Sequence, residues 1–235
     1  MKRYRTTLFS FGARATNLNI EALDSWKPEA KILHEKNRQK TIEGLKWEFG
    51  ARDFDQKFKN FIDMGSAFPS IVFFHNKFLD QIRKSFVMGA YYPAFTGVTT
   101  LMERILNHLI FALREDFRST VEYKEVYGKK SFTDWDMMER ILTSWKVLLP
   151  ETKQYIQKLK KLHHQYAAHF NPETDIRDRE LSLEALKLFQ EFIKVQFGAF
   201  GLQPWFIRCI FYKKRMGESP IHQENLYTEL FISGA

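Results

Sequence analysis

The feature that most limits the fold of this chain is the regular apolar spacing between residues 94 and 117. In the sequence AFTGVTTLMERILNHLIFALREDF, apolar residues recur at i, i+3, i+4 and i+7, which is the spacing of one face of an α-helix. The residues of this face are Val98, Leu101, Met102, Ile105, Leu109, Ile110 and Leu113. The pattern predicts a core helix.

Other segments with the same helical period precede and follow this one, and each ends at a glycine or a proline. They cover residues 54–64, 69–88, 131–149, 151–170 and 181–200. Strand patterns are almost absent over the same range. We therefore expect an all-α fold, an antiparallel helical bundle over residues 51–201 with short connections.

The flanking residues lack this period. Residues 1–50 are polar and weakly periodic, and we expect an irregular arm that packs on the bundle or on a partner. The segment NPETDIRDRE, residues 171–180, is expected to be a charged loop. Residues 202–235 are expected to form an extension that packs on the bundle, in which WFIRCIFYKK is either an extended segment or a short helix.

Charge and cysteine content limit the function. Lys and Arg outnumber Asp and Glu by 36 to 28, and the net charge of +8 favours phosphate-rich partners without establishing them. The single cysteine, Cys209, excludes an intramolecular disulfide framework and a multi-cysteine zinc site. No apolar stretch approaches about 20 residues, and the N-terminus does not read as a secretory signal. The sequence therefore indicates a cytoplasmic protein with no membrane partner.

Three of the seven histidines lie together in KLHHQYAAHFNPETD, residues 161–175, just before an Asn-Pro helix stop. A metal site is not expected, because His163 and His164 point about 100° apart on an ideal helix and His169 shares a face with neither. No cofactor is expected, since phosphate-binding glycine loops are missing, and a serine or cysteine in a setting for nucleophilic catalysis is missing too. Acid and base chemistry by histidine remains.

Two segments together resemble the HEPN superfamily. The first is FVMGAYYPAFTGVTTLMERIL, a small aromatic step that leads into an apolar helix with a glutamate, Glu103. The second is LHHQYAAHFNP, a helix that ends with a histidine, His169. The similarity covers roughly residues 70–200. It implies a helical bundle that usually forms a homodimer and often acts as a metal-independent endoribonuclease, in a toxin-antitoxin or phage-defence setting.

The resemblance also assigns roles to individual residues. His169 matches the family's catalytic histidine, which exchanges a proton with the ribose hydroxyl or the leaving oxygen. The family's arginine, a few residues earlier, is replaced here by His163 or His164, with Lys160 and Lys161 farther upstream. The replacement matters because an imidazole is shorter than a guanidinium and makes only one directed bond from each nitrogen.

The site expected on this basis divides the chemistry between two histidines. His169 transfers the proton, His164 contacts the phosphate, and Glu103 orients one of them. RNA contacts are expected from His163, Gln165, Tyr166, Lys160 and Lys161.

Two other interpretations stay open. Histidines at a helix end often cap the last carbonyl groups and interact favourably with the helix dipole, so these residues can be purely structural. A site that lacks the family's arginine can also be degenerate. In that case the protein is a non-catalytic helical module that binds another protein, such as an antitoxin-like partner.

Overall fold

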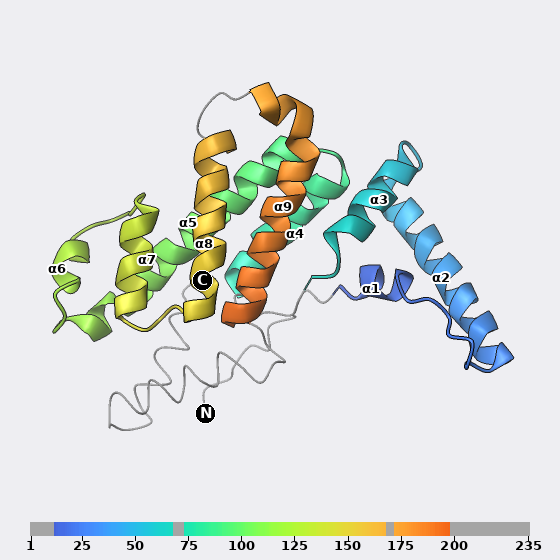
Figure 1. Ribbon diagram of the computed structural model, residues 1–235, viewed down its shortest axis with the longest axis horizontal. Helices are drawn as coiled ribbons and strands as arrows, with labels where there is room; N and C mark the ends of the chain where they lie inside the picture. The colour runs from blue at the N-terminus through green and yellow to red at the C-terminus, as the bar shows by residue number, and fades with distance from the viewer. Residues whose placement is uncertain (1–11, 68–72, 168–171, 198–235) are drawn as a thin grey trace.

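The computed structural model describes residues 12–67, 73–167 and 172–197, and this part of the chain is all-α, as the sequence predicts (Figure 1). Among these residues the only β pairing is one isolated bridge between Gly12 and Ala67. The helices are α1 (Arg14–Leu18), α2 (Pro28–Phe49), α3 (Phe54–Met64), α4 (Phe73–Val87), α5 (Tyr91–Leu113), α6 (Tyr123–Val126), α7 (Trp135–Ser144), α8 (Lys153–Leu162) and α9 (Pro172–Phe197).

Helix α5 is the centre of the bundle. It packs against α4, α7 and α9, and it also touches α8. Every residue of the predicted apolar stripe is buried, from Val98 at 0% exposed to Leu101 at 3%. Gly97 lets α4 approach closely, because a Cβ atom at this position would lie 2.8 Å from Cγ1 of Ile82. The prediction of a core helix is therefore confirmed.

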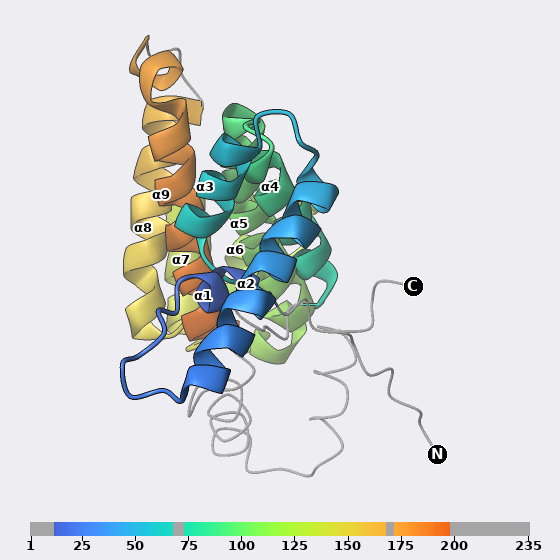
Figure 2. The same ribbon diagram turned by 90° about the vertical axis from the view of Figure 1, so that its right-hand side faces the viewer.

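Two antiparallel helix pairs build the bundle around this core. Helices α4 and α5 are joined by a tight turn in which Gly89 has a positive φ of 83°, the conformation in which glycine commonly follows a helix end. Helices α8 and α9 run in opposite directions and lie side by side, as Figures 1 and 2 both show. The predicted antiparallel arrangement is present in both pairs.

Helix α7 begins where the sequence predicts but ends earlier. Asp134 caps its start by accepting two backbone hydrogen bonds from the first turn. The expected helix runs to residue 149, whereas α7 ends at Ser144. The buried amide of Gln196 explains the difference, because it accepts a hydrogen bond from the N–H of Leu149 at 3.0 Å and donates one to the carbonyl of Val147 at 3.1 Å. These bonds satisfy the backbone of the connection without a helix.

The predicted charged loop at residues 171–180 is wrong over its described part, where α9 already begins at Pro172. Proline fits the first turn of a helix, where its missing N–H group removes no intrahelical hydrogen bond. Ile176 in this first part of α9 is 84% exposed, and Arg177 has non-helical dihedral angles that mark a kink (Figure 1, top). Without a buried apolar stripe, these residues lack the pattern that reveals the other helices.

The expected irregular arm is also wrong for residues 28–49, which form the long helix α2. Pro28 begins this helix, and Gly50, with a φ of 79°, ends it. Leu45 and Phe49 are the only buried residues of α2, so its sequence carries no continuous apolar stripe. Helix α2 contacts α1 and α3; it lies at the right-hand edge of the protein in Figure 1 and faces the viewer in Figure 2.

A buried polar network attaches α3 to the bundle. The amide of Asn60 on α3 is fully buried; it donates to the carbonyl of Phe86 at 3.1 Å and accepts from Arg179 of α9 at 2.9 Å. Arg179 also forms an ion pair with Asp63 at 2.6 Å. Because buried polar groups need partners, this network fixes α3 against α4 and α9.

The predicted C-terminal extension, residues 202–235, lies outside the described residues, and so does Cys209. Within the described ranges, none of the helices is both long enough and apolar enough to cross a membrane.

Candidate functional site

The segment with adjacent histidines forms a π-helical turn at the end of α8. Helix α8 ends at Leu162, and residues His163–Ala167 continue as a π-helix. The predicted α-helix through residue 170 is therefore wrong over His163–Ala167, and its last three residues lie outside the described residues. Hydrogen bonds in a π-helix span i to i+5 and give a wider turn, so the angles between histidines on an ideal α-helix do not apply here. Such turns occur frequently at functional sites.

His163 is held against the body of the protein. Its half-buried ring stacks on the indole of Trp135, with 5.9 Å between ring centroids and 11° between planes. The Nε1–H group of Trp135 in turn donates to Oε2 of Glu103 at 3.3 Å. The structure thus links Glu103 to the histidine segment through an indole. Packing of this kind supports the structural interpretation of His163.

Glu103 does not contact His164, the other described histidine of this segment. Within the described residues, no hydrogen bond or ion pair joins its carboxylate to His164. The residue that sequence analysis missed is Trp135, the first residue of α7. Its only sequence signal is an aromatic side chain directly after the capping residue Asp134, which does not by itself indicate a contact with a histidine.

His164 points to solvent while His163 points inward. The ring of His164 is exposed and meets the ring of His163 edge-on, at 5.7 Å and 63°. Gln165 is exposed as well, whereas Tyr166 is half-buried and packs against the apolar core. His169 lies outside the described residues, so its expected convergence with His164 stays a prediction.

Basic residues extend from this turn along α8. No acidic residue occurs between Glu151 and Glu173. Two of the lysines in this interval form ion pairs with α7: Lys160 with Asp136, and Lys153 with Glu139 at 3.2 Å. The α7–α8 contact therefore neutralises these two charges and leaves the others to solvent.

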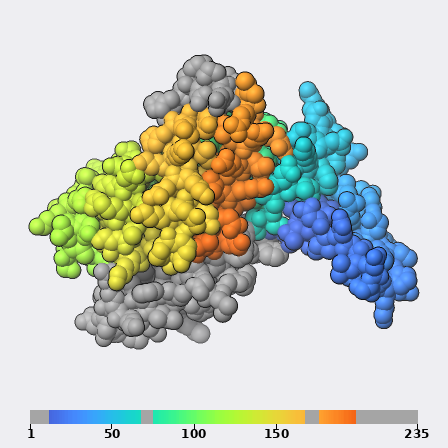
Figure 3. Space-filling view, viewed as in Figure 1, coloured from blue at the N-terminus to red at the C-terminus, as the bar shows by residue number. Residues whose placement is uncertain are grey.

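The remaining lysines of α8, Lys158 and Lys161, are exposed and have no acidic partner among the residues that the structure describes. They are three residues apart, so they lie on one side of the helix with about 4.5 Å of axial rise between them. We call Lys158, Lys161, His164 and Gln165 the α8 basic face. Figure 3 shows α8 at the surface between α7 and α9. Lys158 was not among the expected RNA contacts, although its spacing from Lys161 indicates a shared face.

A second histidine pair lies inside the bundle. Nε2 of His75 on α4 is 3.0 Å from Nδ1 of His108 on α5, and His75 is 3% exposed. Burial, with smaller effects of His108 and Arg104, lowers the pKa of His75 to about 3. The pKa of His108 is lowered as well, mainly by burial. Both imidazoles are therefore neutral near pH 7 and hydrogen-bond to each other, which stabilises the α4–α5 contact.

Comparison with known proteins finds no match among family models, curated proteins or solved structures. In the described part of the chain, no group of three or more His, Cys, Asp or Glu side chains is arranged to hold a metal ion. The α8 basic face and the π-helical turn are therefore the features from which a function can be inferred.

Proposed function

We propose that this chain is a HEPN-like, RNA-associated protein that contacts the sugar-phosphate backbone through the α8 basic face. One observation supports this most strongly: two exposed lysines without acidic partners among the described residues share one side of α8, and an exposed histidine follows in the π-helical turn, in a segment that has no acidic residue. Lysine side chains bind phosphate oxygens as point charges, and such contacts supply most of the sequence-independent affinity for nucleic acids.

The proposed chemistry is cleavage of RNA without a metal ion, in which the 2′-oxygen bonds to the adjacent phosphorus and the bond from that phosphorus to the 5′-oxygen breaks. Lys158 and Lys161 hold the phosphates, and His164 donates a hydrogen bond to the phosphate at the scissile bond. His169 transfers the proton from the 2′-hydroxyl to the leaving 5′-oxygen, in the role that the HEPN resemblance implies. Glu103 and Trp135 act as positioning residues, because they hold His163 and with it the turn that carries His164.

The resemblance extends the proposal to the setting. It adds a homodimer, an antitoxin-like protein partner, and a role in defence or as a toxin, and each of these rests on the family likeness alone. A cytoplasmic location is also part of the proposal and rests on the single cysteine, which fits a reducing compartment. No cofactor or metal is part of the proposed reaction.

Replacing both lysines of the α8 basic face is expected to weaken RNA binding. The Lys158→Ala, Lys161→Ala variant should bind a labelled single-stranded RNA at least about tenfold more weakly in fluorescence anisotropy. Loss of two phosphate contacts should also reduce the slope of log K against log salt by about 1.4. The matched control is Lys59→Ala, Lys124→Ala, which removes two exposed lysines of α3 and α6. Equal effects of the two variants would contradict a specific role for α8.

Cleavage is expected to require His169 and no divalent cation. Purified protein should cut single-stranded RNA in the presence of a chelator and leave a 2′,3′-cyclic phosphate, identified by mass spectrometry of the fragments. His169→Ala should lower the rate by about 100-fold or more, the usual contribution of a general acid or base. Activity that disappears with EDTA, or that survives His169→Ala, would exclude this mechanism.

The alternative is a non-catalytic module with a degenerate site. It is favoured by the imidazole at the position where the family carries a guanidinium, since His164 cannot make a bidentate phosphate contact. This alternative predicts binding without cleavage, and a gain of cleavage in His164→Arg.

A further inference from the structure

The outer face of α2 carries large apolar side chains that no other described part of the chain covers. Trp47 is 89% exposed, Ile32 70% and Leu33 57%. The buried residue Leu45 lies on the opposite side of the helix, because two residues turn an α-helix by about 200°. An exposed tryptophan at this level is unusual for a surface without a partner, and tryptophan is enriched at the centres of protein interfaces.

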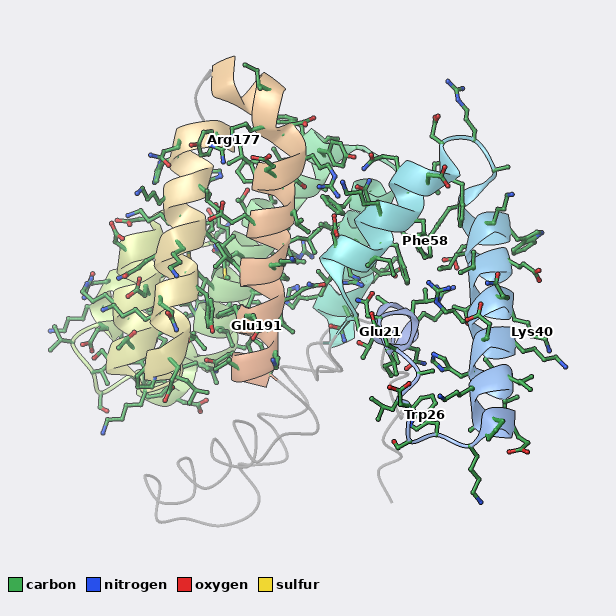
Figure 4. All side chains as sticks on the ribbon, turned by 45° about the vertical axis from the view of Figure 1, so that its right-hand side comes forward. Glu21, Trp26, Lys40, Phe58, Arg177 and Glu191 are labelled. Carbon is green, nitrogen blue, oxygen red and sulfur yellow. The ribbon has the colours of Figure 1, made fainter. Side chains whose placement is uncertain are left out.

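The same face has a regular spacing. Leu33, Lys36, Lys40, Glu43 and Trp47 are separated by alternating steps of three and four residues. This is the spacing of the seam between two packed helices. Figure 4 shows Lys40, in the middle of the seam, extending away from the rest of the protein. All five side chains of the seam are exposed among the residues that the structure describes.

The charged residues of the seam are available for contacts with another molecule. Lys36, Lys40 and Glu43 are exposed, and in the described residues none of them forms an ion pair. Gly44 lies beside the seam, and a Cβ atom added there would have no neighbour within 4 Å. A mid-helix glycine costs about 1 kcal/mol relative to alanine, and it lets the backbone of another helix approach closely.

We propose that α2 packs antiparallel against α2 of a second copy of this chain, about a twofold axis near Lys40. A twofold interface is self-complementary: if one residue contacts another across it, the reverse contact also forms. In this register Leu33 lies level with Trp47 of the second copy, so two apolar contacts form, one at each end. Lys36 lies beside Glu43 of the second copy, and Lys40 is within reach of it.

This charge pattern selects the second copy as the occupant. The parallel arrangement places Lys36, Lys40 and Glu43 opposite their own counterparts, so like charges meet at each level. The antiparallel arrangement pairs lysine with glutamate twice, and each Glu43 also offsets the repulsion between the two Lys40 side chains on the axis. The inference does not depend on RNA binding, because α2 and the α8 basic face share no residue.

Sedimentation equilibrium of the full-length protein tests the interface. The wild type should be a dimer, and Trp47→Glu should raise its dissociation constant at least about 100-fold. The matched control, Val121→Glu, places the same charge at a 77% exposed apolar residue away from α2 and should leave the dimer intact. A monomeric wild type, or a dimer that survives Trp47→Glu, overturns the proposal. A monomer is also the result expected if residues 198–235 cover this face.

A charge exchange and a distance measurement test the register. Glu43→Lys should weaken the dimer, and the triple variant Lys36→Glu, Lys40→Glu, Glu43→Lys should restore it. Spin labels on Lys40→Cys, in a Cys209→Ser background, should lie close together across the axis, whereas labels on Ala30→Cys should be separated by about 30 Å along the helices. Short distances at both positions would show a parallel pair and overturn the proposed arrangement.

Discussion

Replacing Trp145 by alanine is expected to lower the free energy of unfolding by about 3–5 kcal/mol, the usual cost of truncating a large buried ring. Trp145 is 1% exposed and follows the end of α7. Its ring stacks on Phe117, with 4.7 Å between centroids and 2° between planes. Its Nε1–H group donates to the hydroxyl of Thr120 at 3.1 Å. Truncation therefore leaves a cavity and removes a hydrogen bond at the same site.

Urea unfolding, followed by circular dichroism, measures this effect. Trp145→Phe keeps an aromatic ring and loses the hydrogen bond, so it should cost about 1–2 kcal/mol. The control is Tyr127→Ala, which removes a ring that is 69% exposed and should cost less than about 1 kcal/mol. A Trp145→Ala variant within about 1 kcal/mol of the wild type would mean that the connection between α7 and α8 does not pack as described.

The buried pair His75 and His108 is expected to make the protein less stable in acid. Folding lowers the pKa of His75 from 6.5 to about 3, chiefly because burial disfavours the charged ring. The unfolded chain therefore takes up the proton first as the pH falls. The stability that the neutral ring contributes is complete above about pH 6.5 and is lost progressively down to about pH 3, at about 1.4 kcal/mol per pH unit. The full loss is about 3–5 kcal/mol.

The variant His75→Asn separates this effect from the titration of carboxylates. Asparagine is smaller and lacks the imidazole contact, so the variant is expected to be less stable than the wild type near neutral pH. Between about pH 6.5 and pH 4, however, the free energy of unfolding of the variant should fall by about 3 kcal/mol less than that of the wild type. The measurement is urea unfolding of both proteins across this range. Parallel pH profiles would contradict the assignment of the acid sensitivity to His75.

Periodicity predicts the helices that bury one face. Residues 94–117 are nearly correct for this reason, since α5 is covered by several helices and its stripe is continuous. Periodicity does not predict helix α2, because this helix buries only Leu45 and Phe49, which are too few apolar positions to define a helical period. The start of α9 lacks a period for the same reason, and the Asn-Pro pair that predicts a helix stop also places Pro172 where a proline suits the first turn of a helix.

The site was harder to predict than the fold. The stacking of His163 on Trp135 joins residues of different helices, and no local spacing encodes such a contact. The π-helical turn likewise depends on how α8 ends against α5 and α7. The sequence does contain the spacing of Lys158 and Lys161. It does not show the ion pairs that neutralise Lys153 and Lys160, so only the structure distinguishes these two lysines from Lys158 and Lys161, which have no acidic partner in the described part of the chain.

The π-helical turn is the feature that connects the core to the proposed RNA surface. Glu103 on α5 and Trp135 on α7 hold His163, and the next residue, His164, is exposed. Substitutions of Glu103 or Trp135 are therefore expected to alter RNA binding through the position of His164. Substitutions of Lys158 and Lys161 are expected to change the affinity for RNA directly. The two classes differ in salt dependence, since only the lysines release counterions.

The most direct test of this account is photo-crosslinking of the full-length protein to a photoreactive single-stranded RNA, with the attached peptides identified by mass spectrometry. We expect the RNA to crosslink to peptides from the segment 158–169. These crosslinks should be lost in the Lys158→Ala, Lys161→Ala variant and retained in Lys59→Ala, Lys124→Ala. Crosslinks confined to other helices, or no crosslinks under conditions in which a known RNA-binding protein is labelled, would contradict it.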